Sequence, residues 1–247
     1  MWSRNSTYTR IKLCWFEYLE AAYEASSMGA DALGFHILQA GTTDWRCKAE
    51  HFRSVLDILP KEIEKVLLID YPFEVTQEVL AIAPFDSVQL YPDWEPYKIA
   101  QLQATSARRL RVLKVMSAQA HENNPTDAEE FLRRYADCAD AILLDSFRQG
   151  GTGVLADIDH CSMIVKMTSL PVFIAGGLNA ANVAARIRAI RPFGVDVESG
   201  ISDRISGGRM LKNLSKCREF IDAVVRVDRE ILREAVADGT ELIRGGS

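Results

Sequence analysis

The sequence predicts an α/β fold, a single-domain (β/α)8 (TIM) barrel with a helical extension at its C-terminal end. Its length of 247 residues is close to the roughly 250 residues typical of such a barrel. Strand-like and helix-like segments alternate along the chain. Several strands, such as KVLLID (65–70) and DAILLD (140–145), are almost wholly apolar, as in parallel strands buried on both faces. The barrel is expected over about residues 10–226 of the 1–247 domain, with 227–247 as the extension.

Each expected element follows from a local pattern. Strands are predicted where short apolar runs stand between turn residues, at 10–14, 30–38, 65–70, 86–91, 109–116, 140–145, 170–176 and 193–197. Helices are predicted where apolar residues recur three and four apart, at 17–29, 48–59, 73–83, 95–105, 126–138, 157–168 and 179–190. Asn179 is the expected N-cap of the last of these. A closing helix is predicted over 208–226, and the charged residues 228–247 indicate a further helix and a loose end.

One alternative fold is disfavoured by the first turn of the chain. An open, doubly wound sheet that binds a nucleotide has a glycine-rich turn after its first strand, and no such turn follows residues 10–14. Eight strand–helix units in one chain also point to a closed barrel.

Composition narrows the class of protein. The formal net charge of −5 argues against a general nucleic-acid binder, which needs clustered Lys and Arg. No apolar run approaches the roughly 18 residues that cross a membrane, and the N-terminal residues lack the apolar core of a signal peptide. Five cysteines at irregular spacing, with no CxxC pair, suggest reduced thiols and no zinc site. We therefore expect a cytoplasmic protein without a metal, a membrane partner or a nucleic-acid partner.

Two strand ends late in the chain predict a phosphate site. PVFIAGGLNAANV (171–183) ends its strand at Gly176 and Gly177, and PFGVDVESG (192–200) ends near Ser199 and Gly200. Glycine at a strand end lets the backbone come within hydrogen-bonding distance of a ligand. In (β/α)8 barrels the phosphate site often lies after strands seven and eight. The chain is therefore expected to bind a phosphorylated small molecule there.

An acid–base pair is predicted from two other strand ends. Cys14 ends the first strand and Asp145 the sixth, so that a small substrate fits between them. Lys12 shares the strand face of Cys14, and an ammonium nearby should lower the thiol pKa from its usual value of about 8.5. Asp145 follows an apolar run, where a carboxyl tends to keep its proton. Plain structural roles stay open: a small buried hydrophobe for Cys14 and a helix cap for Asp145.

A glycine-rich loop follows the second member of this pair. QGGTGVLADI (149–158) contains three glycines and is expected either to close over the ligand or to form a simple turn.

Together these segments resemble the phosphoribosylanthranilate isomerases of tryptophan biosynthesis. The resemblance spans about residues 10–226 and is carried by KLC (12–14), GADALGF (29–35), VQLY (88–91), LLDS (143–146) with GGTG (150–153), AGGLNAANV (175–183) and VDVESG (195–200). It implies a (β/α)8 barrel and an Amadori rearrangement, in which an N-linked phosphoribosyl amine becomes a 1-deoxyketose phosphate. It also implies that no cofactor is needed.

The resemblance implies a role for each matched position. Asp145 would protonate the ribose ring oxygen and Cys14 would take the proton from C2′. Backbone N–H groups of Gly177, Ser199 and Gly200, next to Gly176, would hold the phosphate. Asp196 would lie close to the substrate.

The residues that would recognise the anthranilate part match less well. Trp15 stands where the family has glycine, and Tyr91 stands where it has histidine. Arg46 is displaced by about a position from the arginine that binds the anthranilate carboxylate, and VLADI (154–158) replaces the family's usual continuation.

These departures leave alternatives open. They include a divergent relative acting on another aglycone, a catalytically silent sugar-phosphate-binding barrel that serves as a partner subunit, and another phosphate-binding barrel enzyme. The sequence leaves both a monomer and a homodimer possible.

Overall fold

The structure, a computed structural model, describes residues 7–39, 44–121, 125–146, 155–205 and 210–239. Eight parallel strands pair in sequence order and close into a barrel, with the first pairing to the last. The strands are β1 (Arg10–Leu13), β2 (Ala32–Ile37), β3 (Glu64–Ile69), β4 (Ser87–Leu90), β5 (Arg111–Ser117), β6 (Ala141–Asp145), β7 (Val172–Ala175) and β8 (Gly194–Val197). The predicted (β/α)8 barrel is therefore confirmed.

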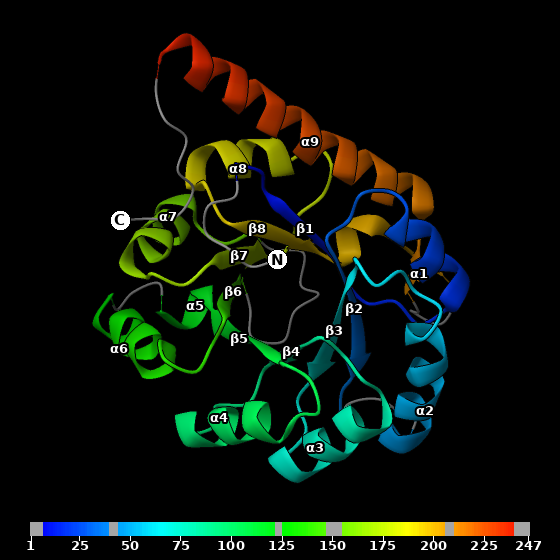
Figure 1. The fold of residues 1–247 in the computed structure, drawn as a ribbon. Coiled ribbons are helices and arrows are strands. Elements are labelled where there is room, and N and C mark those ends of the chain that lie inside the picture. Colours follow the sequence, from blue (N-terminus) through cyan, green and yellow to red (C-terminus); the bar gives the residue numbers. More distant parts are fainter. Residues whose placement is uncertain (1–6, 40–43, 122–124, 147–154, 206–209, 240–247) are drawn as a thin grey trace.

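Helices surround the strands as an outer ring (Figure 1). They are α1 (Leu19–Ser26), α2 (Trp45–Leu56), α3 (Phe73–Ile82), α4 (Pro96–Thr105), α5 (Ala118–His121), α6 (Pro125–Tyr135), α7 (Ile158–Met167), α8 (Val183–Ile190) and α9 (Leu214–Ala237). The sequence had not indicated the short α5. Each long helix follows its strand by way of the loops that surround the barrel mouth, which is where functional residues of such barrels lie.

Strand residues alternate between two cores. Side chains such as Leu13 and Phe35 point outward and pack under the helices. Inside the barrel a second cluster contains Leu113, Leu143 and Phe173. Successive side chains of a strand point to opposite faces. Because Leu13 points outward, Lys12 and Cys14 on either side of it point into the barrel.

The predicted C-terminal extension is present, but it is not a separate helix. One continuous helix of 24 residues, α9, crosses the predicted boundary near residue 226. Its buried stripe continues through Val224, Val227 and Ile231, so that it packs against α8 and α1 without a break. Asp228 anchors the helix by accepting hydrogen bonds from the backbone N–H and the hydroxyl of Thr9, at 2.6 and 2.8 Å.

Two further differences concern turns. The closing helix begins at Leu214, later than the predicted residue 208, because Met210–Lys212 form strand β10, which pairs antiparallel with β9 (Ser202–Arg204). Asn179 is not the N-cap of α8, which begins at Val183. Its side chain instead accepts hydrogen bonds from the N–H groups of Ala181 and Asn182, in the turn before the helix.

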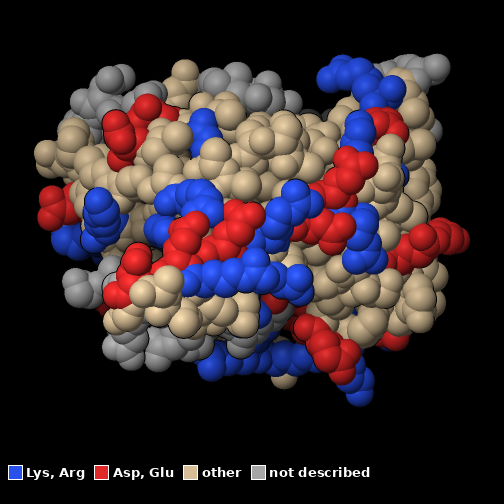
Figure 2. Space-filling model, turned by 90° about the horizontal axis from the view of Figure 1, so that it is seen from above, with Lys and Arg blue, Asp and Glu red and all other residues tan. Residues whose placement is uncertain are grey.

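The outer surface beside α9 carries mixed charge. Figure 2, seen from above, shows Lys and Arg interleaved with Asp and Glu across this face. Arg188 on α8, for example, pairs with both Glu230 and Glu234 of α9, at 2.7 and 2.9 Å. Among the described residues, no helix is both long and apolar enough to cross a membrane.

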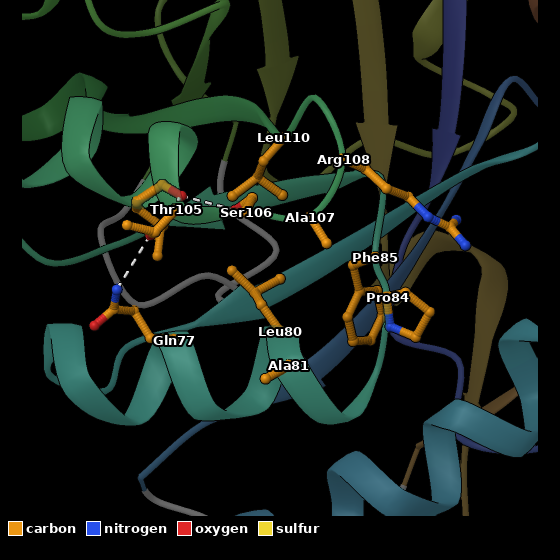
Figure 3. A pocket seen from close by; sticks show the side chains of 11 residues that line it. Gln77, Leu80, Ala81, Pro84, Phe85, Thr105, Ser106, Ala107, Arg108 and Leu110 are labelled. Atoms are coloured by element: carbon orange, nitrogen blue, oxygen red, sulfur yellow. Dashed lines mark hydrogen bonds between the residues drawn. The ribbon is translucent and has the colours of Figure 1, made fainter.

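A cavity of about 360 Å³ opens between α3 and α4 (Figure 3). Leu80, Phe85, Leu102 and Leu110 give it an apolar wall, and Arg108 lies at one side. It lies beside the loops that lead into β4 and β5, so that it is at the end of the barrel opposite the carboxyl ends of the strands. In barrels of this kind that end serves stability rather than chemistry.

Candidate active site

The carboxyl ends of the strands enclose one small cavity. It is lined by Cys14, Gln89, Tyr91, Asp145, Ala175, Gly176, Gly177, Leu178, Asp196, Val197, Glu198 and Ser199. The structure thus brings the predicted acid–base residues, Cys14 and Asp145, together with the glycines predicted to hold a phosphate. Both side chains are buried, with relative exposures of 2% for Cys14 and 6% for Asp145.

Cys14 lies next to a buried ion pair. Lys12 and Asp196 stand opposite each other in the pairing of β1 with β8. The Lys12 Nζ donates to Asp196 Oδ1 at 2.8 Å and to Cys14 Sγ at 3.2 Å. The ammonium, which is almost fully buried, is therefore shared between a carboxylate and the thiol.

This pair reverses the expected effect on the thiol. Burial and the Asp196 carboxylate outweigh the neighbouring Lys12 and raise the pKa of Cys14 to about 12. The prediction of a lowered pKa was wrong because it counted the lysine without the burial of the thiol and without the carboxylate that faces the lysine from β8. In the free protein Cys14 is a thiol at neutral pH, and Lys12 is placed to stabilise the thiolate once the proton leaves.

The raised pKa has a measurable consequence for alkylation. Cys47 is exposed whereas Cys14 is buried, and only a thiolate reacts readily. We expect iodoacetamide at pH 7–8 to modify Cys47 while Cys14 stays unmodified, as measured by mass spectrometry of tryptic peptides. Equal labelling of the two cysteines in the folded protein would contradict both the burial and the pKa of Cys14.

The predicted phosphate end is built from tightly packed glycines. Gly176 and Gly177 have φ angles of +87° and +65°, which side chains rarely adopt. Gly200 lies in the 3-10 turn Ser199–Ile201, and a Cβ there would come within 2.0 Å of the Leu178 carbonyl oxygen. The side-chain amide of Asn182 fixes this region by donating to the Gly177 carbonyl at 2.9 Å. The two loops therefore pack closely against each other, and Gly176, Gly177 and Ser199 line the cavity while Gly200 lies just behind it.

Gly176 allows a direct test of this packing. A Cβ there would lie 2.2 Å from Ser146 Oγ, whereas Gly239, with φ +64°, has nothing within 4 Å. We expect Gly176→Ala to destabilise the protein by about 1–3 kcal/mol more than Gly239→Ala, because overpacking is added to a similar backbone strain. Urea unfolding of both variants measures the difference. Equal costs would show that the Ser146 side chain moves aside freely.

Two polar cavity residues were missed by the sequence analysis. Gln89 is buried on β4 and its side-chain amide donates to the Tyr91 hydroxyl at 2.9 Å. Glu198 comes two residues after Asp196, directly past the end of β8, and burial raises the pKa of its carboxyl. Strand periodicity was the available signal, because each lies two residues from a position already singled out. Burial also raises the pKa of Tyr91 well above its usual value, so that it is a neutral phenol in the cavity.

Arg46 is not brought to this cavity. It lies in the first turn of α2, and its guanidinium pairs with Glu78 of α3 at 2.5 Å. The side chain is 53% exposed and stands 4.6 Å over the ring of Trp45. The predicted closing loop lies largely outside the described residues, because 147–154 are not described. Within the described part of the chain, no group of three or more His, Cys, Asp and Glu side chains is arranged to hold a metal ion.

Comparison with known proteins agrees with this geometry. The sequence model of the family "N-(5'phosphoribosyl)anthranilate (PRA) isomerase" matches residues 13–223. The chain is 34% identical to the N-(5'-phosphoribosyl)anthranilate isomerase of Methanocella arvoryzae, over 87% of this chain and 98% of that protein. It is 29% identical to the enzyme of the same name from Methanopyrus kandleri, over 88% and 99% of the two chains.

Solved structures agree on the fold. The crystal structure of phosphoribosyl anthranilate isomerase from Thermus thermophilus superposes with a TM-score of 0.72 at 23% identity, covering 89% of this chain and all of that one. A phosphoribosyl anthranilate isomerase in complex with reduced 1-(o-carboxyphenylamino)-1-deoxyribulose 5-phosphate has a TM-score of 0.68 at 23% identity, over 88% and 99% of the two chains. With its family match over most of the barrel, this chain belongs to the N-(5'-phosphoribosyl)anthranilate isomerase family.

Proposed function

We propose that this chain isomerises N-(5'-phosphoribosyl)anthranilate to 1-(2-carboxyphenylamino)-1-deoxyribulose 5-phosphate, with Asp145 as general acid and Cys14 as general base. The observation that carries the residue roles is that one cavity contains both side chains beside Gly176 and Gly177. The relatives named for this reaction match most of the chain.

The chemistry requires one proton donor and one proton acceptor on either side of the sugar. Asp145 donates a proton to the ribose ring oxygen, the C1′–oxygen bond breaks, and the amine nitrogen supplies the electron pair that forms an iminium at C1′. Cys14 acts as a thiolate, after its own proton has passed to solvent: it removes the proton from C2′, and the electrons of that C–H bond neutralise the iminium to give an enolamine. The enolamine tautomerises to the 1-deoxyketose, so that no atoms or electrons are gained overall.

The charged neighbours support these steps. Lys12, at 3.2 Å from the sulfur, stabilises the Cys14 thiolate that acts as the base. Asp196 holds that lysine in place at 2.8 Å and lies close to the sugar. Backbone N–H groups of Gly177, Ser199 and Gly200 bind the phosphate at the edge of the cavity.

The ligand, the cellular compartment and the absence of a cofactor are proposed as the sequence analysis expects them. The partner is a phosphorylated small molecule, in the cytoplasm and without a cofactor. A monomer and a homodimer both remain compatible with the site. A relative from Thermotoga maritima is described as dimeric.

Two measurements test the proposal. The gene should restore growth without tryptophan to a strain that lacks its own isomerase, and the purified chain should convert N-(5'-phosphoribosyl)anthranilate in vitro. A chain with Asp145→Asn is the matched control for both. If the purified protein binds the reduced product analogue but never turns over the substrate, the catalytically silent barrel is the correct description.

A further inference from the structure

We propose that Trp15, His36 and Lys48 form the subsite that recognises the aromatic ring and the carboxylate of the aglycone, a task that the sequence assigned to Arg46. This inference rests on the proposed function, and it concerns three residues that lie outside the lining of the small cavity, beginning with the residue that follows Cys14. Three observations support it: a stacked aromatic pair, a lysine held against it and an unpaired buried nitrogen.

The aromatic pair begins at the residue next to Cys14. Trp15 follows Cys14 in the chain and has a φ of +70°, in the left-handed region that favours glycine. In that conformation its ring stacks on the His36 ring, with centroids 3.7 Å apart and an angle of 21° between the planes. A bulky residue in this backbone region is strained, and such strain is found most often at functional sites. The stack provides a flat surface, fixed one residue from Cys14, on which a second ring can stack.

Lys48 supplies the charge. Its Nζ lies 3.0 Å from His36 Nε2, a distance at which the ammonium donates and the imidazole accepts. Burial and the charges of Lys48 and Lys212 lower the pKa of His36 to about 3, which keeps the imidazole neutral. The neutral ring then carries its proton on Nδ1. That nitrogen is buried without a hydrogen-bond partner among the described residues, and the side chain is only 5% exposed.

The ammonium is also available to a ligand. None of the ion pairs between described residues includes Lys48, and Glu17 is the carboxylate of the described chain whose charge acts on it. The Glu17 carboxylate lies 3.4 Å from the same His36 nitrogen and is 37% exposed. Arg46, by contrast, is already paired with Glu78 on the outer side of α2. An aromatic carboxylate arriving at the Trp15–His36 stack therefore meets Lys48 first.

The experiment uses two probes that differ by one group. The first is reduced 1-(o-carboxyphenylamino)-1-deoxyribulose 5-phosphate, and the second is the same compound without the carboxyl group. Both are titrated calorimetrically into the wild-type protein, Lys48→Met and Arg46→Met, with Arg53→Met, an exposed position on α2, as the matched control. We expect Lys48→Met to weaken the binding of the carboxylated probe by about 10-fold to 100-fold, as for the loss of a hydrogen bond to a charged group. The affinity for the other probe should stay unchanged.

Two further variants test the remaining members of the subsite. Glu17→Gln removes a competing carboxylate and should raise the affinity for the carboxylated probe alone. Trp15→Gly removes the ring at a backbone position that suits glycine, so that the fold is retained. It should weaken both probes to the same extent, by about 2-fold to 10-fold.

The results separate this inference from the proposed function. If Arg46→Met loses the preference for the carboxylated probe while Lys48→Met keeps it, the inference is wrong. The proposed function would still stand, because turnover by the wild-type protein is measured separately. If Trp15→Gly leaves both probes unchanged, the stack does not contact the aglycone. If the wild-type protein shows the Lys48-dependent preference but no turnover, the subsite is supported and the proposed activity fails.

Discussion

Replacing Asp145 by asparagine is expected to lower kcat for N-(5'-phosphoribosyl)anthranilate by about 10²- to 10⁴-fold, the range supplied by general acid catalysis. The amide has the shape of the carboxyl group but cannot give a proton to the ring oxygen. Asp145 is buried at the end of β6 and lines the cavity with Cys14. Single-turnover measurements with purified protein give kcat separately from substrate binding.

Binding should survive this change. The phosphate is held by backbone groups after β7 and β8, which the substitution does not touch, so that the affinity for the reduced product analogue should stay within a few-fold of the wild-type value. Cys14→Ser should give a similar loss of kcat, because a serine hydroxyl is a much weaker base than a thiolate. The double variant should be little worse than either single one, since residues that act as a unit are not additive.

One result would contradict the assignment. An Asp145→Asn variant that keeps more than a tenth of the wild-type kcat would show that another group protonates the ring oxygen. Glu198 would then be the next residue to replace, since it lines the same cavity and its pKa is raised by burial.

The barrel could be predicted because its strands are buried on both faces. Runs such as AILLD on β6 contain no polar alternation, and each is followed by a helix with apolar residues three and four apart. The positions of Cys14 and Asp145 followed from this, since the ends of barrel strands meet at one mouth. The glycines after β7 and β8 were informative for a similar reason: Gly176 and Gly177 have positive φ angles, and Gly176 and Gly200 are packed so closely that a Cβ has no room.

The predictions that were wrong concern features that depend on contacts between distant parts of the chain. The partner of Lys12 is Asp196, which is 184 positions away in sequence, and burial together with this carboxylate raises the Cys14 pKa that was predicted to be lowered. The direction of the Arg46 side chain depends on Glu78 in the neighbouring helix. The unbroken course of α9 depends on the buried stripe that it places against α8 and α1. Local patterns contain none of this information.

The ion pair between Lys12 and Asp196 should have a large effect on stability. The side-chain exposures are 1% and 7%, so that neither charge is solvated by water. Asp196→Asn leaves the ammonium without its counter-charge and is expected to destabilise the protein by about 3–5 kcal/mol, as for other broken buried pairs. Lys12→Met should cost a similar amount. The double variant Lys12→Met with Asp196→Leu should recover most of the loss, because apolar side chains can replace such a pair. Urea unfolding of the wild-type protein, Lys12→Met, Asp196→Leu and the double variant measures the coupling, and simple additivity would contradict it.

The two single substitutions Asp196→Asn and Lys12→Met should shift the pKa of Cys14 in opposite directions. Asp196 raises the thiol pKa and Lys12 lowers it. Asp196→Asn therefore leaves Lys12 unopposed and should lower the pKa from about 12, so that alkylation of Cys14 accelerates at a lower pH than in the wild-type protein. Lys12→Met should move the alkylation profile to higher pH. Because unfolding would speed alkylation of every buried cysteine, Cys161 on α7, buried and far from the cavity lining, serves as the internal control. If both variants shift Cys14 in the same direction, and Cys161 with it, the change reports loosened structure and not the charge balance between β1 and β8.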